Sequence, residues 1–496
     1  MLTLTAGTAL TEGLDAVVLE ADEGCAPALP AGLGSPGLVA AIDRARAAAG
    51  RFAVRPGDFL DLFGLPEAPA PLVVLANPGQ HRRRAADHDW LAFGGRLAAH
   101  LNRAGVARAG LALRPPDEAL LALLTGLCLR AHSFDKYRTG VPAYPRCTLN
   151  HVAVIGDAAA LVDRFTREAA PSVEGTLLAR DLCHEPANRL TPSRLAEVAT
   201  GTARDTGMGV EILADDDLAR LGMEAFLAVG RGSPQGCRMA VLTWNGLPPE
   251  RRSEPPLVLV GKGVTFDAGG ITLKTGPDLR HNKWDMAGAA AVIGAMRALA
   301  ARRAPAHVVG IAAMAENMPS GTAQKPGDVV RSMAGRTIEV VFPDGEGRLI
   351  LADALWYAAT RFRPAAIVDV ATLTDEVSHV LGTETAGLIS NDDRLAERLI
   401  AAGRRTGERL WRLPLADEYE RYIRSDIADL RNWGDGHLAA TCLAGQFLSH
   451  FVDGRPWAHL DIAWAAWSLW DSPLAGRGPT GFGVRLLDRF AEDFFS

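Results

Sequence analysis

Short apolar runs alternate with helix-like stretches along this 496-residue chain, and this alternation constrains the fold more than any other feature of the sequence. In the first third, apolar runs begin near residues 15, 71, 109 and 151. Between them, the stretches 90–105 and 117–131 repeat apolar residues at helical spacing. Strands that alternate with helices are typical of α/β units, so this part predicts a small α/β domain.

The second part repeats the alternation with more strongly apolar strands. Continuous apolar runs begin at residues 257, 307, 337 and 366, and such runs suit a sheet that is covered on both faces. Helices are predicted over 286–303 and 349–361. We therefore expect an α/β protein with a small N-terminal domain and a larger C-terminal domain. The central sheet of the larger domain should be mostly parallel or mixed, with helices on both faces.

The domain boundary is predicted in the polar passage 167–175, which precedes a helix expected from about 175 to 185. This gives domains of residues 1–168 and 169–496. The formal charge is −6, and residues 1–170 hold 17 Lys+Arg against 17 Asp+Glu, which leaves 35 against 41 for the rest. All of the excess acid thus lies in the later part.

Several classes of protein are disfavoured by composition. The start of the chain lacks a basic segment followed by a sustained apolar one, so a signal peptide is not expected. No stretch of about 18 uninterrupted apolar residues occurs, so a membrane span is not expected. The six cysteines are scattered without a C-x-x-C pair, which predicts reduced thiols and a cytoplasmic location. Nucleic-acid binding needs a basic surface, and Arg82–Arg84 is the one notable basic run of the first domain. Nucleic acid is therefore disfavoured as a partner.

Lysine is rare in this chain, and its positions are informative. The 52 Lys+Arg include five lysines, four of which fall between residues 262 and 325. Unlike a guanidinium, an ammonium group can lose its proton when buried, and the neutral amine can then ligate a metal. Lys262, Lys274 and Lys283 are interleaved with Asp267 and Asp285, so this segment predicts a site. Lys283 and Lys325 are expected to be surface or loop charges.

Further acids stand next to turns in the second part, at Asp344, Glu346 and Asp375. Lys262 should follow the strand at 257, and Asp344 and Glu346 the strand at 337, so that both groups meet at one sheet edge. Carboxylates gathered in this way repel one another unless cations are present. Oxygen-rich ligation with one nitrogen suits a centre of two zinc, manganese or magnesium ions.

Each of these elements also has a simpler interpretation. Asp285 could cap the N-terminus of the following helix, and Gly345–Gly347 could be a plain turn. The G-K-G at 261–263 lacks the spacing of a phosphate-binding loop, so nucleotide binding is rejected.

Several long motifs closely resemble those of the leucyl aminopeptidase family, the dizinc cytosol aminopeptidases. The family hallmark N-T-D-A-E-G-R-L corresponds to F-P-D-G-E-G-R-L at 342–349. The family segment V-G-K-G-x-T-F-D-S-G-G corresponds to 260–270, with Ala268 in place of serine. The resemblance covers essentially all of 175–485 and also includes the stretches 180–188, 316–321, 326–330, 457–463 and 479–483. The first 165 residues carry no comparable motif.

The resemblance implies the role of each residue in the site. Two divalent ions, zinc or manganese, would be ligated by Lys262, Asp267, Asp285, Asp344 and Glu346, with Lys262 as a neutral amine. Lys274 and Arg348 would be the catalytic residues that do not ligate metal. An ion-activated hydroxide would attack the carbonyl of the first residue, Lys274 would stabilise the oxyanion, and Arg348 would hold a bicarbonate ion as general base.

Departures from the family pattern concern specificity. Phe342 and Pro343 replace Asn-Thr beside the expected ligand Asp344, which stiffens the loop and removes polar groups around the metals. The pocket for the first side chain would be formed by Asn282, Thr372, Asp375, Ala463 and Ala466. Family members usually have glycine where Asp375 stands and methionine where Asn282 stands. We therefore expect a pocket more polar than one for leucine, unless Asp375 points away and caps a helix.

The resemblance also implies a homohexamer with interior active sites, which would restrict substrates to short peptides with a free N-terminus. Two other functions stay open at this point. Some bacterial relatives also bind DNA, and the Phe342-Pro343 departure could mark a catalytically silent scaffold.

Overall fold

The fold is described from a computed structural model. This structure describes residues 1–7, 13–21, 36–49, 57–78, 87–140, 147–436 and 438–496. The chain divides into two compact units. The first comprises Met1–Val173 together with Trp470–Arg477, and the second comprises Glu174–Leu469 and Gly478–Ser496. The segment 470–477 thus belongs to the first unit although it lies near the end of the sequence. The boundary predicted between 168 and 169 lies five residues before the division at 173.

The first unit contains a six-stranded sheet in the order β1-β6-β5-β2-β4-β3. All neighbouring strands are parallel except β3, which runs antiparallel to β4. The strands are β1 Thr3–Gly7, β2 Ala16–Glu20, β3 Phe59–Phe63, β4 Leu72–Ala76, β5 Arg108–Ala112 and β6 His151–Ile155. The helices are α1 Pro36–Ala49, α2 Asp87–Arg103, α3 Asp117–Arg130 and α4 Ala159–Glu168. The prediction that the first part of the chain has an α/β fold is confirmed.

The polar passage 167–175 is mostly helical. Helix α4 ends at Glu168, and α5 (Ala170–His184) begins two residues later with Pro171 in its first turn, where proline is well tolerated. The division between the two units therefore falls inside α5 and not in an extended linker.

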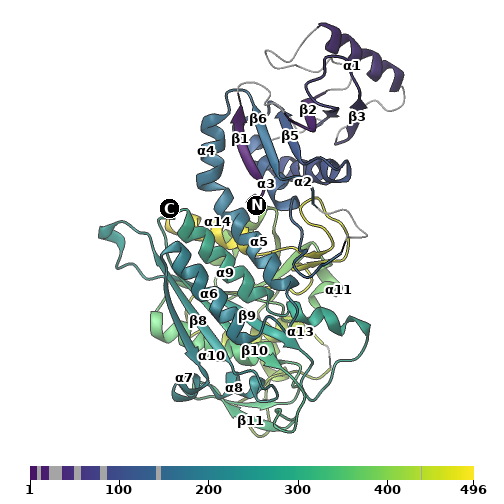
Figure 1. Ribbon diagram of the computed structural model, residues 1–496. Helices are drawn as coiled ribbons and strands as arrows, with labels where there is room; N and C mark the ends of the chain where they lie inside the picture. Colours follow the sequence, from purple (N-terminus) through teal and green to yellow (C-terminus); the bar gives the residue numbers. More distant parts are fainter. Residues whose placement is uncertain (8–12, 22–35, 50–56, 79–86, 141–146, 437) are drawn as a thin grey trace. The chain divides into compact units, whose positions relative to one another are not determined.

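The second unit is built on a mixed eight-stranded sheet in the order β15-β14-β17-β13-β9-β10-β8-β7 (Figure 1). Its four central strands, β17, β13, β9 and β10, are mutually parallel. The strands are β7 Gly209–Ala214, β8 Arg238–Asn245, β9 Leu257–Asp267, β10 His307–Asn317, β13 Ala366–Ala371, β14 Thr385–Ser390, β15 Arg409–Arg412 and β17 Trp457–Asp461. Two small sheets accompany it, formed by β11 Asp328–Arg331, β12 Thr337–Val340 and β16 Leu430–Arg431, and by β18 Trp467–Ser468 and β19 Gly478–Pro479.

Helices cover both faces of the eight-stranded sheet, as predicted. The α-helices are α6 Pro192–Thr206, α7 Asp215–Arg220, α8 Glu224–Gly230, α9 Ala287–Ala301, α10 Glu346–Phe362, α11 Val377–Leu381, α12 Asp393–Thr406, α13 Ala440–Ser449 and α14 Val484–Phe495. The 3-10 helices are η3 Pro249–Arg251, η4 Pro277–Trp284 and η5 Asp417–Tyr422. Along β9, Leu257 and Leu259 pack with α6, α9, α12 and α14, whereas Val258 and Val260 pack with α8, α10 and α13. This alternation explains the continuous apolar run, because both faces of the strand are buried.

Helix α9 lies unusually close to the sheet. A Cβ on Gly288 would lie 2.0 Å from the carbonyl oxygen of Val370 in β13, and one on Gly261 of β9 would lie 2.5 Å from the carbonyl oxygen of Gly288. Only glycines permit this approach of backbone to backbone. It sets the start of α9, and thus Asp285 just before it, directly against β9.

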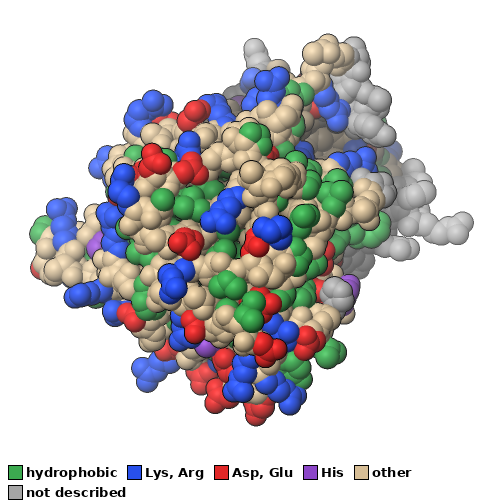
Figure 2. All heavy atoms as spheres, turned by 90° about the horizontal axis from the view of Figure 1, so that it is seen from below, with side chains coloured by type: hydrophobic (Ala, Val, Ile, Leu, Met, Phe, Trp, Pro, Cys, Tyr) green, Lys and Arg blue, Asp and Glu red, His purple; other side chains and the backbone are tan. Residues whose placement is uncertain are grey.

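Within the described ranges, none of the helices combines the length and the apolar character that a membrane span requires. On the face seen in Figure 2, the Lys and Arg side chains are interspersed with Asp and Glu side chains. Residues 82–84, the basic run noted in the sequence, lie outside the described residues.

Candidate metal centre and active site

Lys262 lies within a strand of the central sheet and does not follow it, contrary to the prediction. Strand β9 runs on to Asp267, because its parallel neighbour β10 is equally long and pairs with it from Leu257 to Asp267. The strand at 337 was also misplaced, since β12 belongs to a separate three-stranded sheet. The predicted groups meet nonetheless, because the turn after β12 leads into α10, which packs against β9.

The four acids come from four different local structures. Asp267 is the last residue of β9, and Asp285 directly follows η4. Asp344 lies in the turn between β12 and α10, and Glu346 is the first residue of α10. Asp285 does not occupy the N-cap position of α9, which is Met286, and no side-chain cap hydrogen bond forms there. The simpler interpretation of Asp285 as an N-cap is therefore wrong.

Lys262 joins two of these acids in the interior of the site. Its Nζ lies 2.7 Å from Asp285 Oδ1 and 2.7 Å from Glu346 Oε1, and it donates to the carbonyl oxygen of Thr372 at 2.7 Å. The side chain is buried. Burial opposes a charge on the amine, but the attraction of the surrounding carboxylates outweighs it and raises the pKa of Lys262.

Lys274 joins the other two acids. Its Nζ forms ion pairs with Asp267 and, at 3.0 Å, with Asp344 Oδ1. One carboxylate oxygen from each of Asp267, Asp344 and Glu346 lies within 4.8 Å of the others, so these three side chains could hold a metal ion. The structure thus brings all five predicted metal ligands and Lys274 into one cluster.

The four carboxylates of the cluster outnumber its two lysines. Burial and the neighbouring acids raise the pKa of Asp285 well above its usual range and that of Asp344 to about 8. By contrast, Lys274 and Lys262 outweigh burial at Asp267 and lower its pKa. Within the described part of the chain, three buried oxygens of the cluster accept no hydrogen bond, namely Asp285 Oδ2, Asp344 Oδ1 and Glu346 Oε1, although the last two lie within ion-pair distance of a lysine. Such oxygens are suited to divalent cations.

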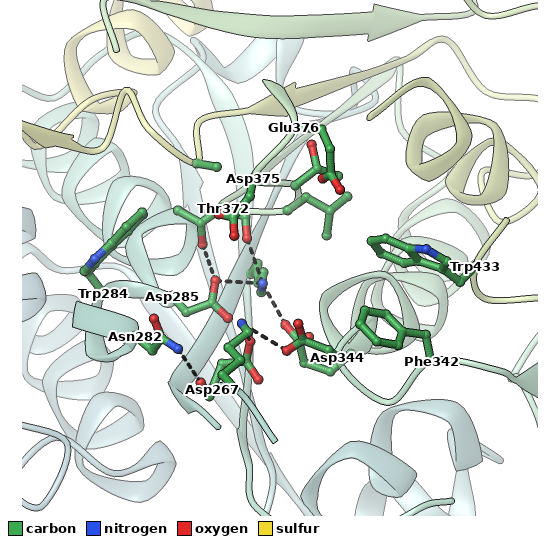
Figure 3. Close-up of a pocket in the computed structure, with 16 residues that line it drawn as sticks. Asp267, Asn282, Trp284, Asp285, Phe342, Asp344, Thr372, Asp375, Glu376 and Trp433 are labelled. Atoms are coloured by element: carbon green, nitrogen blue, oxygen red, sulfur yellow. Dashed lines mark hydrogen bonds and ion pairs between the residues drawn. The ribbon is translucent and has the colours of Figure 1, made fainter. Parts of the chain in front are cut away.

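The cluster opens into a cavity of about 190 Å³. Figure 3 shows Asp285, Asp267 and Asp344 in its centre, with Asn282 and Trp284 on one side and Phe342 and Trp433 on the other. The cavity is lined by Lys262, Asp267, Lys274, Asn282, Trp284, Asp285, Phe342, Asp344, Glu346, Thr372, Leu373, Thr374, Asp375, Glu376, Trp433 and Ala463. Ala466, the fifth residue predicted for the substrate pocket, is not among them and is buried in the hydrophobic core that also includes residues of α9 and β17.

Arg348 lies behind the cavity wall. Its side chain is only 1% exposed, and its guanidinium carbon lies 4.3 Å from the ring centre of Trp433. Among the described residues, its Nε and Nη2 find no hydrogen-bond partner. Burial lowers the pKa of Arg348 to about 10, so the group remains charged at neutral pH. A buried cation with unused donors is suited to a small anion.

Two of the predicted pocket residues also support the cluster. Asn282 Nδ2 donates to the carbonyl oxygen of Asp267 at 2.8 Å, and Thr372 Oγ1 donates to Asp285 Oδ1 at 2.6 Å. Asp375 is exposed at the cavity wall, and its side chain does not cap α11, whose N-cap position is Glu376. The alternative in which Asp375 caps a helix is therefore not what the structure shows.

Sequence reasoning missed Trp284, Trp433 and Glu376 in the cavity lining. An isolated tryptophan in a loop gives no signal of its own, and Trp433 reaches the cavity from a segment about ninety residues after Phe342. Lys283 and Lys325 do not line the cavity. Lys283 donates to the carbonyl oxygen of His184, and Lys325 pairs with Asp328 at 3.0 Å.

Comparisons with known proteins identify the family of this chain. Residues 177–488 match the model of the cytosol aminopeptidase family, catalytic domain. A probable cytosol aminopeptidase of Bradyrhizobium sp. is 42% identical over 92% of this chain and 91% of its own length. One of Agrobacterium fabrum is 42% identical over 97% of this chain and 96% of its own. Among solved structures, the bottromycin maturation enzyme BotP in complex with Mn has a TM-score of 0.84 and 34% identity, and the match covers 98% of this chain and 100% of that one.

The fold and the acid-rich cluster, together with these matches, define a metal-dependent hydrolase that acts on peptide bonds. More specifically, the chain belongs to the cytosol aminopeptidase family.

Proposed function

We propose that this chain removes the N-terminal residue from short peptides with the help of two divalent ions. Lys262, Asp267, Asp285, Asp344 and Glu346 would hold the ions. The observation that carries the proposal is the convergence of four carboxylates on one cavity, where three buried oxygens accept no hydrogen bond. Two divalent cations match four carboxylates in charge, and zinc or manganese accepts such oxygen ligands together with one amine.

The bound ions would lower the pKa of a water molecule and polarise the carbonyl of the first residue. Lys274 supplies a positive charge at the same place. Its side chain is 31% exposed towards the cavity, and its two carboxylate partners fix its Nζ beside the cluster. We assign it the role of donor to the oxyanion that develops on the carbonyl oxygen.

Arg348 would hold a small anion such as bicarbonate, which would accept the proton of the attacking water. Two nitrogens of its charged guanidinium have no hydrogen-bond partner among the described residues, and its guanidinium carbon lies over the ring of Trp433 at 4.3 Å.

The first side chain of the peptide would lie against Asn282, Thr372, Asp375 and Ala463, which all line the cavity. Asp375 places an exposed carboxylate on this wall, so we propose that basic or small polar first residues are favoured. Steady-state kinetics on a panel of amino-acid amides tests this part of the proposal. A clear preference for leucine over arginine and lysine would contradict it.

A peptide pair that differs only at its N-terminus tests the activity itself. The chain loaded with Mn²⁺ should release the first residue from a tripeptide with a free amino group and leave the N-acetylated tripeptide intact. The Lys274→Ala variant should keep its fold and its metal but lose about 100-fold or more in kcat. Cleavage of both peptides at an internal bond would reject the aminopeptidase assignment. A folded, metal-loaded parent that cleaves neither peptide would instead indicate a silent scaffold.

We further propose a cytoplasmic homohexamer. The sequence supports the location through its scattered thiols, and the cytosol aminopeptidase relatives support it through their names. A small active-site cavity is compatible with short peptides as substrates. Nucleic acid is not expected as a partner, because the first 170 residues carry no net charge.

A further inference from the structure

We propose that Phe342 and Trp433 form an aromatic subsite that selects an apolar, preferably aromatic, side chain in the second residue of the peptide. This inference rests on the proposed aminopeptidase function. It concerns the side of the cavity that is not assigned to the first residue of the peptide.

The two rings form one continuous surface. Phe342 and Trp433 both line the cavity, with ring centres 4.9 Å apart and planes inclined by 55°. Figure 3 shows them together on the side of Asp344, across the carboxylate cluster from Asn282 and Trp284. The cavity therefore has an aromatic surface across the cluster from the polar side chain of Asn282, which lies beside Trp284.

This aromatic wall is held rigidly. Asn432 is fully buried, and its Oδ1 accepts from the backbone N–H groups of Val341 at 2.9 Å and Phe342 at 3.2 Å. Its Nδ2 donates to the carbonyl oxygen of Phe342 at 2.7 Å. One residue thus ties the Phe342 backbone to the segment that carries Trp433.

Trp433 itself is fixed from two directions. The guanidinium of Arg348 lies over its ring at 4.3 Å. A Cβ on Gly345 would lie 3.2 Å from Trp433 Cε3, so this glycine lets the ring pack against the turn that bears Asp344. A subsite that is ordered before the substrate arrives loses little entropy on binding.

The position of the cluster assigns this wall to the second residue. The bond to be cleaved has to lie at the carboxylate cluster, and consecutive side chains of an extended peptide point in opposite directions. If the first side chain lies against Asn282 and Asp375, the second is directed towards Phe342 and Trp433. Aromatic rings prefer tilted or offset contacts with other rings, which favours phenylalanine or tyrosine at this place.

Dipeptides with one constant first residue and Gly, Ala, Leu or Phe as the second test the inference. With Mn²⁺-loaded protein, kcat/KM should be about 10-fold or more higher for Phe than for Gly in the second position. Phe342→Ala should reduce this ratio to near one, while the order of preference among first residues on amino-acid amides stays as in the parent. Trp284→Ala is the matched control, an aromatic residue removed from the opposite wall, and should leave the second-residue ratio intact. Phe342→Leu, with a melting curve for each variant, replaces Phe342→Ala if that variant does not fold, and should reduce the ratio in part.

Three outcomes would overturn the inference. The parent could show no second-residue preference, Phe342→Ala and Phe342→Leu could leave the preference unchanged, or they could shift the first-residue preference instead. In each of these cases the protein still hydrolyses amides, so the proposed function survives. Failure of the parent to hydrolyse any amide or dipeptide would overturn both proposals together.

Discussion

The Nζ of Lys262 lies 2.7 Å from three oxygens: it donates to the carbonyl oxygen of Thr372 and forms ion pairs with Asp285 Oδ1 and Glu346 Oε1. The surrounding carboxylates raise its pKa, so the amine is charged while they are uncompensated. Divalent cations bound to the same carboxylates would reverse this preference, because they would repel the ammonium proton. Lys262 can therefore balance the charge of the carboxylates as an ammonium group, and it can ligate a bound metal ion as a neutral amine.

The Lys262→Arg variant tests this dual role. A guanidinium keeps the charge but cannot become a neutral ligand, so one of the two ions should bind at least about 100-fold more weakly. Metal analysis after dialysis should then find fewer ions per chain than in the parent. Lys325→Arg is the control, because Lys325 is exposed and pairs with Asp328. Equal metal content in parent and Lys262→Arg would show that Lys262 is not a ligand.

At the scale of elements, the site depends on how closely α9 approaches the sheet. A methyl group on Gly288 would meet a backbone oxygen of β13 at 2.0 Å, so Gly288→Ala must push helix and strand apart. We expect a loss of about 1–3 kcal/mol in the free energy of unfolding. Gly201→Ala in α6 is the matched control, since its Cβ would meet nothing within 4 Å, and it should stabilise the protein by up to about 1 kcal/mol. Urea denaturation of both variants checks this, and equal effects would contradict it.

Helix α10, which carries Glu346 and Arg348, is anchored by the buried carboxylate of Asp353. This carboxylate accepts from the backbone N–H groups of Phe226 at 2.9 Å and Met333 at 2.7 Å. Burial outweighs these bonds and raises the pKa of Asp353 to about 7. A carboxyl with a raised folded-state pKa stabilises the fold most below its unfolded pKa, and this contribution is lost as the pH rises through 7.

The Asp353→Asn variant should therefore remove part of the pH dependence of stability. From pH 6 to pH 8, the free energy of unfolding of the parent should fall by about 1 kcal/mol more than that of the variant. Urea titrations of both proteins at the two pH values measure the difference. The same pH dependence in both would mean that Asp353 does not titrate in this range.

Much of this arrangement could be predicted from the sequence, because apolar runs report burial directly. The runs at 257, 307 and 366 lie in neighbouring central strands, and their continuous apolar character follows from burial on both faces. Pairing partners leave no such signal. The strand at 337 has a similar composition but pairs with β11 and β16 in another sheet. Strand β9 extends past Lys262 because β10 continues beside it, which its own sequence does not reveal.

The site could be predicted as far as its acids and lysines, since these residue types are unusual in an apolar strand or beside a glycine turn. Its walls could not. Trp433 reaches the cavity through hydrogen bonds of its neighbour Asn432 to Val341 and Phe342, which depend on the folded chain. Ala466 was expected in the pocket but lies in the core.

For the whole molecule, the proposal of a homohexamer predicts a mass in solution of six times 52.6 kDa. Light scattering on the purified chain measures this mass directly. Exposed large apolar side chains in the second unit, among them Trp411 and Val380, offer area that such an assembly could bury. A mass of 52.6 kDa at all concentrations tested would contradict the assembly and leave the chemistry of the cluster unaffected.

A metal titration of activity tests the proposed two-metal centre most directly. The protein is stripped with a chelator, Mn²⁺ is added back in known amounts, and the release of the N-terminal residue from a peptide is followed. The stripped protein should have no activity, and the rate should saturate at two ions per chain. Full activity in the stripped protein, or saturation at a single ion, would contradict the proposed two-metal centre.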